Sequence, residues 1–269
     1  MDINKIYISD CRKMDKIEDE SVHLIVTSPP YWFIKDYGNK DQIGFGETYE
    51  NYINNLNLVW KECYRVLHKG CWLCINIGDA YTGVKTFGRH KVVSIQSEII
   101  RGIEDIGRSD GNYIDYMGSI IWKKISNCHP IGGASVMGSY PTPRNPLVEF
   151  SYEYILLFRK YGKSPKSPQD KSIDSMTLPE WRDFTNSIWT FPGAKQGVDG
   201  HYAVFPEAIP HRLIRMFSFS NEIVLDPFMG SGTTALACIN LNRNFIGYEI
   251  NEGYKTAIIN KLKGKVIFE

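Results

Sequence analysis

The sequence predicts an α/β fold in which helices cover both faces of a doubly wound, mainly parallel seven-stranded sheet. Short apolar runs typical of strands alternate with segments whose apolar residues recur at helical spacing. The chain has 269 residues, 43% of them hydrophobic, which is enough for the core of one large domain. Two of the strand-like runs end in loops whose residue types suit ligand binding, and ligands of such sheets bind beyond the carboxyl ends of the strands.

The expected elements follow in chain order. The seven strands are expected at residues 5–9, 22–28, 71–78, 119–124, 152–159, 222–225 and 244–249. Helices are expected at residues 49–67, 91–106, 206–217 and 233–241, with Lys69-Gly70 closing the first. Residues 127–146 and 163–200 contain many glycines and prolines, so both stretches are expected to be irregular loops.

The strand at residues 222–225 runs into a glycine-rich loop. Gly230-x-Gly232-x-x-Ala235 has the spacing of a dinucleotide-fold turn, in which glycines permit positive φ and close approach of a ligand to the backbone. Glu249 ends the next strand, where a carboxylate accepts hydrogen bonds from ribose hydroxyls. An ordinary βαβ turn with a solvated Glu249 has the same pattern. The missing Lys after the glycines argues against a phosphate-binding P-loop.

The strand at residues 22–28 runs into a loop with two prolines. Pro29 and Pro30 fix φ and hold Ser28 and Pro29 outside helical conformations, which leaves their carbonyls without intrahelical partners. These carbonyls and the Ser28 hydroxyl are able to accept hydrogen bonds from an amino group, and Tyr31 offers a ring for stacking. Taken alone, this loop is more typical of a rigid surface turn over a packed aromatic ring. Its occurrence beside the glycine turn favours ligand binding.

Several segments together resemble the beta group of DNA amino-methyltransferases, which transfer a methyl group from S-adenosyl-L-methionine to an exocyclic base nitrogen. Thr27-Ser28-Pro29-Pro30-Tyr31 resembles their catalytic motif, and Asp226-Pro227-Phe228-x-Gly230-Ser231-Gly232-Thr233 resembles their cofactor motif. Supporting matches are His201-x-Ala203-x-Phe205-Pro206-Glu207, Phe245-Ile246-Gly247-Tyr248-Glu249, the strand at residues 152–160 and Asp10. The matches run from about residue 5 to about residue 262. The catalytic motif comes first, which is the permuted order of this group.

The resemblance implies a Rossmann-like methyltransferase fold and assigns roles to individual residues. The implied catalytic residues are Ser28, Pro29, Pro30 and Tyr31. The implied cofactor-binding residues are Asp10, Thr27, His201, Ala203, Phe205, Pro206, Asp226, Pro227, Phe228, Gly230, Ser231, Gly232, Thr233 and Glu249. A single domain, 1–269, is expected, with a catalytic half at about 1–160, a small target-recognition insert at about 161–200 and a cofactor-binding half at about 201–269.

The resemblance also implies the reaction and the partners. Ser28 stands where other members carry Asp or Asn, which favours the cytosine-N4 subgroup, whereas the chemistry of a hydroxyl acceptor leaves adenine-N6 open. Double-stranded DNA is the expected substrate and is methylated at a specific site after base flipping. A cognate restriction endonuclease and a homodimer are further expected partners.

Other classes of protein explain only part of this pattern. A nicotinamide-dependent dehydrogenase would explain the glycine turn and Glu249 but not Ser28-Pro29-Pro30-Tyr31. A non-catalytic nucleic-acid-binding module would explain a basic loop but not an intact cofactor motif. An RNA or protein methyltransferase would use the same cofactor pocket.

The net charge of +1 gives no overall attraction to DNA, so local charge matters more. Residues 159–171 carry five Lys or Arg side chains against one Asp, a local charge of +4, in a segment rich in glycine and proline. Such a segment suits phosphate contacts, although a solvated linker has the same composition. The tentative DNA-binding residues are Lys124, Arg144, Lys163 and Lys166.

The remaining features favour a reduced, cytoplasmic protein of a prokaryote. The sequence has no run of 18 apolar residues, and its first residues do not form a signal peptide. The six cysteines lack the spacing of a metal site, and Cys71 and Cys74 are expected on opposite faces of one strand. Reduced core thiols and no bound metal are therefore expected.

Overall fold

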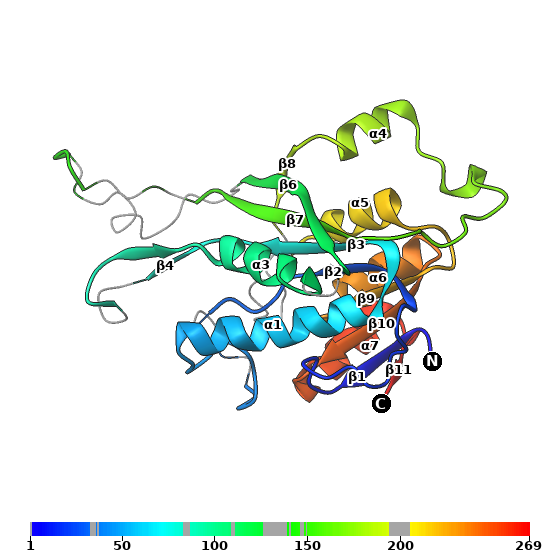
Figure 1. Cartoon of the computed structure of the whole chain (residues 1–269), viewed down its shortest axis with the longest axis horizontal. Helices are drawn as coiled ribbons and strands as arrows, with labels where there is room; N and C mark the ends of the chain where they lie inside the picture. The colour runs from blue at the N-terminus through cyan, green and yellow to red at the C-terminus, as the bar shows by residue number, and fades with distance from the viewer. Residues whose placement is uncertain are drawn as a thin grey trace.

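The computed structural model describes residues 2–32, 36, 38–82, 87–108, 111–125, 139, 141–145, 148, 150–193 and 205–269. Within these ranges, nine strands form one sheet through the centre of the molecule (Figure 1). In spatial order they are β11 (Ile267–Phe268), β1 (Lys5–Ile8), β10 (Asn244–Glu249), β9 (Ile223–Asp226), β2 (Val22–Thr27), β3 (Leu67–Ile77), β7 (Tyr152–Lys160), β6 (Ile114–Ile125) and β8 (Ile188–Pro192).

Strand β7 is antiparallel to both of its neighbours, and the other neighbouring pairs are parallel. The predicted mainly parallel α/β fold is thereby confirmed. The seven predicted strands form the middle of the sheet, and the short strands β8 and β11 extend it at its two edges.

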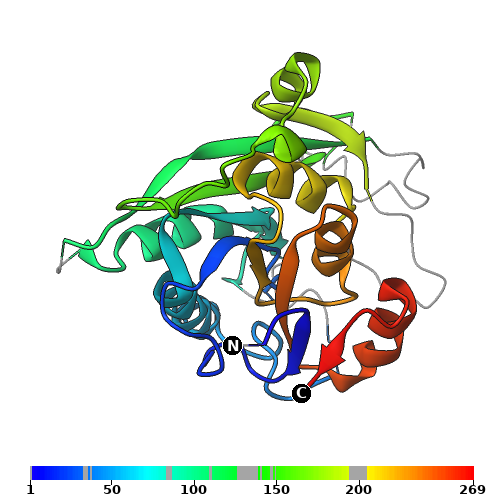
Figure 2. The same ribbon diagram turned by 90° about the vertical axis from the view of Figure 1, so that its right-hand side faces the viewer.

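Alternating side chains along the central strands divide the core into two layers. Leu24 and Val26 of β2 pack with α5 (Ala208–Phe217), α6 (Thr233–Asn240) and α7 (Lys255–Leu262). Ile25 points to the other face and packs with α1 (Tyr49–Val66) and α3 (Ile95–Glu104). Figure 2 shows these two helical layers on opposite sides of the sheet. Because both faces are covered, ligands reach the sheet at its strand ends.

Helix α1 begins and ends close to its predicted bounds. The Thr48 hydroxyl caps it by accepting a hydrogen bond from the Asn51 amide at 3.2 Å. The prediction that Lys69-Gly70 closes this helix is wrong, because β3 starts directly at Leu67. Gly70 instead lies inside β3 with φ +75°, where a Cβ atom would come within 2.6 Å of the Ser164 backbone. Its role is to permit a close approach of two chain segments.

Two further predictions need correction. The segment expected to be helical from residue 91 first forms strand β5 (Lys91–Val93), which pairs with β4 (Ala80–Thr82) as a hairpin, and α3 starts only at Ile95. The two valines of β5 favour this strand. The stretch 163–200 is not wholly irregular, because it contains η3 (Ser172–Asp174), α4 (Leu178–Phe184) and β8.

Helix α4 starts with a capping box. Thr177 Oγ1 accepts a hydrogen bond from the Glu180 amide, and the Glu180 carboxylate accepts one from the Thr177 amide, both at 3.3 Å. Pro179 occupies the first turn, where its missing N–H costs nothing. Figures 1 and 2 show α4 at the β8 edge of the sheet.

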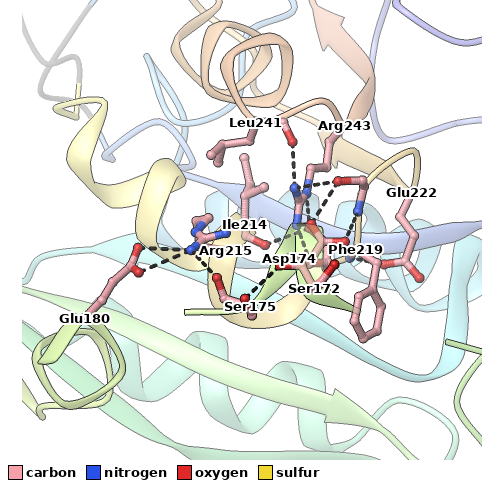
Figure 3. Close-up of polar contacts among 12 residues, drawn as sticks. Ser172, Asp174, Ser175, Glu180, Ile214, Arg215, Phe219, Glu222, Leu241 and Arg243 are labelled. Atoms are coloured by element: carbon pink, nitrogen blue, oxygen red, sulfur yellow. Dashed lines mark hydrogen bonds and ion pairs between the residues drawn. The ribbon is translucent and has the colours of Figure 1, made fainter. Parts of the chain in front are cut away.

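A buried ion pair fastens η3 to the segments that precede β9 and β10 (Figure 3). Arg243 Nη2 lies 2.8 Å from Asp174 Oδ1, and the two side chains are only 2% and 5% exposed. Arg243 also donates to the carbonyls of Ser218 and Leu241 at 2.7 and 2.6 Å. The Ser220 amide and hydroxyl donate to Asp174 at 2.9 Å. Both charges are thus paired and hydrogen-bonded, which offsets the cost of burying them.

Three findings bear on the remaining structural expectations. Within the described residues, no helix is long and apolar enough to span a bilayer. Cys71 and Cys74 are buried in the two different core layers, as expected, and are unpaired thiols. No cluster of three His, Cys, Asp or Glu side chains suited to a metal ion occurs in the part of the chain that the structure describes.

Replacing Arg243 tests the contribution of the buried pair. Arg243→Met leaves the Asp174 carboxylate buried without its counter-ion, so we expect the free energy of unfolding at pH 7 to fall by about 3–5 kcal/mol. Urea denaturation measures this change. Arg101→Met is the matched control, because the Arg101–Glu98 pair is exposed and its loss costs less than about 1 kcal/mol.

The same pair predicts an acid dependence. Burial alone would raise the pKa of Asp174, but the Ser220 hydrogen bonds and Arg243 lower it overall. A lowered folded-state pKa stabilises the protein above the unfolded pKa of about 3.9, and this contribution is lost as the pH falls through the folded pKa. An Arg243→Met protein as stable as the wild type would contradict the assigned role of the pair.

Candidate active site

Parallel strands bring the two predicted loops to the same edge of the sheet. β1, β10, β9 and β2 are neighbours, and their carboxyl ends lead to Asp10, Glu249, Asp226 and Ser28. A cleft of about 910 Å³, including its open mouth, lies at this edge. Its lining residues are Ser9, Asp10, Cys11, Ser28, Pro30, Gln42, Ile43, Phe205, Pro227, Phe228, Met229, Gly230, Ser231, Thr233, Tyr248, Glu249, Ile250 and Tyr254. The proline loop and the glycine loop therefore open into one cleft.

A buried carboxylate joins the two loops. Asp226, the last residue of β9, is 1% exposed. Its Oδ1 accepts hydrogen bonds from Thr27 Oγ1 at 2.7 Å and from the Phe228 amide at 3.0 Å, and its Oδ2 accepts one from Thr234 Oγ1 at 2.6 Å. Burial raises the pKa of Asp226 to about 6, against the lowering effect of these donors. The three donors fix the proline loop, the glycine loop and the start of α6 to one another.

The glycine loop has the backbone that its sequence predicts. Gly230 and Gly232 have φ values of +53° and +81°, which other residues adopt only with strain. Helix α6 begins at Thr233, so its free amides and its positive dipole end face the cleft side of the loop. Ser231 and Thr233 line the cleft. Backbone amides, small hydroxyls and a helix start together suit the polar parts of a cofactor.

Glu249 lies at the end of β10 as predicted, and it is 9% exposed. Its Oε2 accepts a hydrogen bond from the Gly230 amide and its Oε1 one from the Asn251 amide, both at 2.8 Å. Burial raises the pKa of Glu249, and these two amides oppose the rise. Each oxygen keeps a further lone pair, so the carboxylate is able to accept from ligand hydroxyls while the protein holds it in place.

The proline loop is anchored by aromatic residues. Tyr52 of α1 donates its hydroxyl to the Pro30 carbonyl at 2.9 Å, and the Trp32 indole donates to the Glu47 carbonyl at 3.0 Å. Among the described residues, none donates to the Ser28 hydroxyl or to the Pro29 carbonyl. These two acceptors are available to a ligand amino group, as the sequence predicts.

Tyr31 is held through its hydroxyl, which accepts a hydrogen bond from the Gly78 amide at 2.9 Å. A Cβ atom on Gly78 would lie 3.2 Å from this hydroxyl and 3.1 Å from Cγ of Glu153, so glycine gives both side chains room. Burial and the nearby Glu153 carboxylate raise the pKa of Tyr31 well above its usual value. The ring is therefore neutral at physiological pH, and its position depends on Gly78 and Glu153, which the sequence did not identify.

The structure brings most of the predicted site residues to the cleft. Those that line it are Asp10, Ser28, Pro30, Phe205, Pro227, Phe228, Gly230, Ser231, Thr233 and Glu249. Those that neighbour the lining residues in the chain without lining the cleft are Thr27, Pro29, Tyr31, Pro206, Asp226 and Gly232. His201 and Ala203 lie outside the described residues. The cofactor-binding and catalytic roles of all these residues remain predictions.

Asp10 lines the cleft, but the protein already engages its carboxylate. Arg12 Nη2 and Nε lie 2.6 and 2.8 Å from Asp10 Oδ2, and the Arg12 amide donates to Oδ1 at 2.8 Å. The charge of the Asp10 carboxylate is therefore already neutralised by Arg12. Such a carboxylate suits contact with a neutral adenine better than contact with a cation.

The tentative DNA-binding residues are spread over the molecule. Lys124 is the second-last residue of β6, at the carboxyl edge of the parallel strands, where it forms an ion pair with Glu153. Arg144 is exposed. Lys163 and Lys166 follow β7, whose antiparallel direction leads them to the amino-terminal part of β3, where Ser164 donates to the Gly70 carbonyl at 3.2 Å. The structure thus places these two lysines at the opposite edge of the sheet, away from the cleft.

Several lining residues were not predicted. Gln42 and Ile43 come from the segment before α1 and are only 5% exposed, and Tyr254 comes from η4 (Glu252–Tyr254) after β10. No motif marks them, because tertiary packing alone brings them to the cleft. The apolar surfaces of Ile43 and Tyr254 suit a flat heterocyclic ring.

The sheet with a cleft at its carboxyl edge is shared with a solved structure of an S-adenosylmethionine-bound DNA modification methylase, which places the fold in the methyltransferase class. The putative DNA modification methylase TTHA0409 of Thermus thermophilus, whose crystal structure contains S-adenosyl-L-methionine, is similar with a TM-score of 0.77 and 30% identity over 98% of this chain and 94% of that one. The cytosine-N4-specific PvuII DNA methyltransferase shares the fold, with a TM-score of 0.66 and 20% identity over 97% of this chain and 86% of that one.

Sequence comparison gives the family. The family described as DNA methylase (N6_N4_Mtase) matches residues 22–261. The Type II methyltransferase M.MjaI of Methanocaldococcus jannaschii is 39% identical, covering 96% of this chain and 91% of the relative. M.SmaI of Serratia marcescens is 32% identical, covering 93% and 87%. The chain belongs to the N6/N4 DNA methylase family.

These findings confirm the predicted beta-group resemblance, the methyltransferase fold and S-adenosyl-L-methionine as the cofactor. The chain is an S-adenosylmethionine-dependent DNA methyltransferase of the N4/N6 type. The family match favours this class over the nicotinamide-dependent dehydrogenase.

Removing one donor from Asp226 tests the link between the loops. Thr27→Val is isosteric but leaves Oδ1 with the Phe228 amide alone, so we expect the free energy of unfolding to fall by about 1–3 kcal/mol. We also expect a weaker affinity for S-adenosyl-L-methionine, measured by isothermal titration calorimetry. Thr27→Ser, which keeps the donor, is the control. Equal affinities of the Val and wild-type proteins would show that the cofactor loop does not depend on this bond.

Proposed function

We propose that the protein is a site-specific DNA methyltransferase that methylates the exocyclic N4 nitrogen of cytosine. The observation that carries this proposal is the shared cleft, in which Ser28 of the proline loop lies together with the glycine loop and Glu249. The family supplies DNA as the substrate class, and Ser28 supplies the preference for cytosine.

The cofactor half of the cleft has the groups that hold S-adenosyl-L-methionine. When bound, this cofactor supplies an electrophilic methyl group on a sulfonium sulfur. Glu249 would accept hydrogen bonds from its ribose hydroxyls, and apolar side chains such as Ile250 and Tyr254 would enclose its adenine. The amides at the start of α6 would hold its polar tail.

The catalytic loop orients the target nitrogen. An exocyclic amino nitrogen is a weak nucleophile, because its lone pair is delocalised into the ring. The Ser28 hydroxyl and the Pro29 carbonyl accept hydrogen bonds from the two amino hydrogens and direct the lone pair toward the methyl group. Alignment of the two reactants is the main catalytic contribution. Ser28 is not ionised at neutral pH, so the proton released by the amino nitrogen leaves to solvent.

The target base must leave the duplex to reach this loop. Tyr31 provides the stacking surface for the flipped base, with its ring fixed through the Gly78 amide. The expected division of the chain into a catalytic half at 1–160, a target-recognition insert at 161–200 and a cofactor half at 201–269 fits this scheme. The described part of the insert includes α4 and β8, which carry the exposed side chains Trp181 and Ile188.

Adenine-N6 methylation is the second candidate. The family includes both activities, and the same two acceptors are able to hold the amino group of either base. Cytosine has one ring and needs less space beside Tyr31 than adenine, which has two. The methylated nucleoside recovered from the DNA shows which base is the target.

The biological setting follows from the relatives. Those named above are Type II methyltransferases of an archaeon and a bacterium, so we propose a Type II restriction–modification role in the cytoplasm of a prokaryote. A cognate restriction endonuclease and a homodimer belong to this proposal.

Transfer of a labelled methyl group tests the function. The purified protein is incubated with tritiated S-adenosyl-L-methionine and genomic DNA that is not methylated at N4 or N6, and the DNA is digested to nucleosides. We expect label in N4-methyldeoxycytidine. Label in N6-methyldeoxyadenosine would support the second candidate, and label in neither, with RNA labelled instead, would overturn the proposal.

Tyr31→Ala tests the stacking role. Loss of a base-stacking ring costs about 1–3 kcal/mol, so we expect kcat/KM for DNA to fall about 5- to 150-fold with little change in cofactor affinity. Tyr31→Phe keeps the ring and should retain more activity. Full activity of the Ala variant would contradict the assignment.

A further inference from the structure

Lys261 of α7 reaches the glycine loop from the neighbouring helix. Its Nζ donates to Ser231 Oγ at 2.6 Å and to Thr233 Oγ1 at 3.2 Å. Both hydroxyls line the cleft, whereas Lys261 itself was not among the predicted site residues. The ammonium group therefore contacts two residues of the cleft wall.

No acidic side chain neutralises this ammonium group within the described part of the chain. Glu207 acts on it through space, but Glu207 Oε1 accepts a hydrogen bond from Asn240 at 2.9 Å instead of forming an ion pair with Lys261. Burial lowers the pKa of Lys261, as expected for a cation that has lost water without gaining a counter-ion. A partly buried cation of this kind favours the arrival of an anion.

The surroundings of Lys261 favour an anion at the same place. Helix α6 starts at Thr233, so its first amides and the positive end of its dipole add to the charge of Lys261. S-Adenosyl-L-methionine carries one anionic group, the carboxylate of its methionine portion. In the proposed function, the ribose binds at Glu249 and the sulfonium methyl group lies near Ser28. The side of the cleft formed by the glycine loop is then left for that carboxylate.

We propose that Lys261 is a cofactor-recognition residue that provides the positive charge for the carboxylate of S-adenosyl-L-methionine, directly or through the Ser231 and Thr233 hydroxyls. This inference rests on the proposed use of the cleft as the cofactor site. It goes beyond the sequence motifs, because Lys261 lies outside every segment that resembles the cofactor motif. Lys261 also holds the two hydroxyls in place before the cofactor arrives, which reduces the ordering needed on binding.

The test compares two cofactors that differ only in the carboxylate. Dissociation constants for S-adenosyl-L-methionine and for decarboxylated S-adenosylmethionine are measured by calorimetry with the wild type and with Lys261→Met. For Lys261→Met we expect an affinity for S-adenosyl-L-methionine that is about 10- to 150-fold weaker, the factor that corresponds to about 1.5–3 kcal/mol for a hydrogen bond to a charged group. The affinity for decarboxylated S-adenosylmethionine should change less than about 2-fold, because this cofactor lacks the group that Lys261 recognises.

Control variants separate charge from structure. Lys265→Met removes an exposed lysine close by and should change neither affinity. Lys261→Arg keeps the charge and should retain part of the preference for the carboxylate, whereas Lys261→Gln keeps a donor without the charge and should lose it. Thermal melting shows whether each variant is folded. If Lys261→Met is unfolded, Lys261→Gln takes its place in the comparison.

The outcomes distinguish this inference from the function on which it rests. If the wild type binds neither cofactor, the assignment of the cleft fails. If the wild type binds both cofactors, Lys261→Met and Lys261→Gln are compared with it. Affinities for the two cofactors that fall equally in these variants would mean that Lys261 only supports the loop. Unchanged affinities for both cofactors would likewise overturn its role in carboxylate recognition.

Discussion

The site depends on one buried carboxylate. Asp226 accepts hydrogen bonds from Thr27, Phe228 and Thr234, and these donors belong to the proline loop, the glycine loop and helix α6. Parallel strands bring the two loops to the same edge, but strand pairing alone does not fix how they face each other. The Asp226 hydrogen bonds supply that constraint. The acceptors on Ser28 and Pro29 therefore keep a defined position relative to the cofactor loop, and this is what a transfer reaction by alignment requires.

Burying the Asp226 carboxylate costs free energy, and this cost is reflected in its raised pKa. Burial raises this pKa to about 6, so the folded state holds a proton on Asp226 more tightly than the unfolded chain does. The contribution of this residue to stability is therefore largest below the unfolded pKa and declines as the pH rises toward 6. At neutral pH the carboxylate is ionised and depends on its three donors. Glu249 is under a similar constraint, since burial raises its pKa while the Gly230 and Asn251 amides hold it.

Local patterns were sufficient to predict the seven central strands of the sheet and the two loops. The alternation of strands and helices, the prolines at 29 and 30 and the glycines at 230 and 232 act over a few residues, and the structure has them where they were predicted. Features that depend on contacts between distant segments were not predictable in this way. Gly78 and Glu153 reach Tyr31, and Lys261 reaches the glycine loop, only after folding. The position of the lysines after β7 was not predictable for the same reason, because the direction of β7 decides which edge of the sheet they occupy.

The central claim is that the proline loop and the glycine loop form one reaction centre. A crystal structure with sinefungin, which carries an amine in place of the sulfonium methyl group, tests it most directly. The account predicts ribose hydroxyls on Glu249 and an amine that faces Ser28 across a gap able to admit an amino nitrogen at about 3–3.5 Å. Sinefungin bound elsewhere, or with its amine turned away from Ser28, would contradict it.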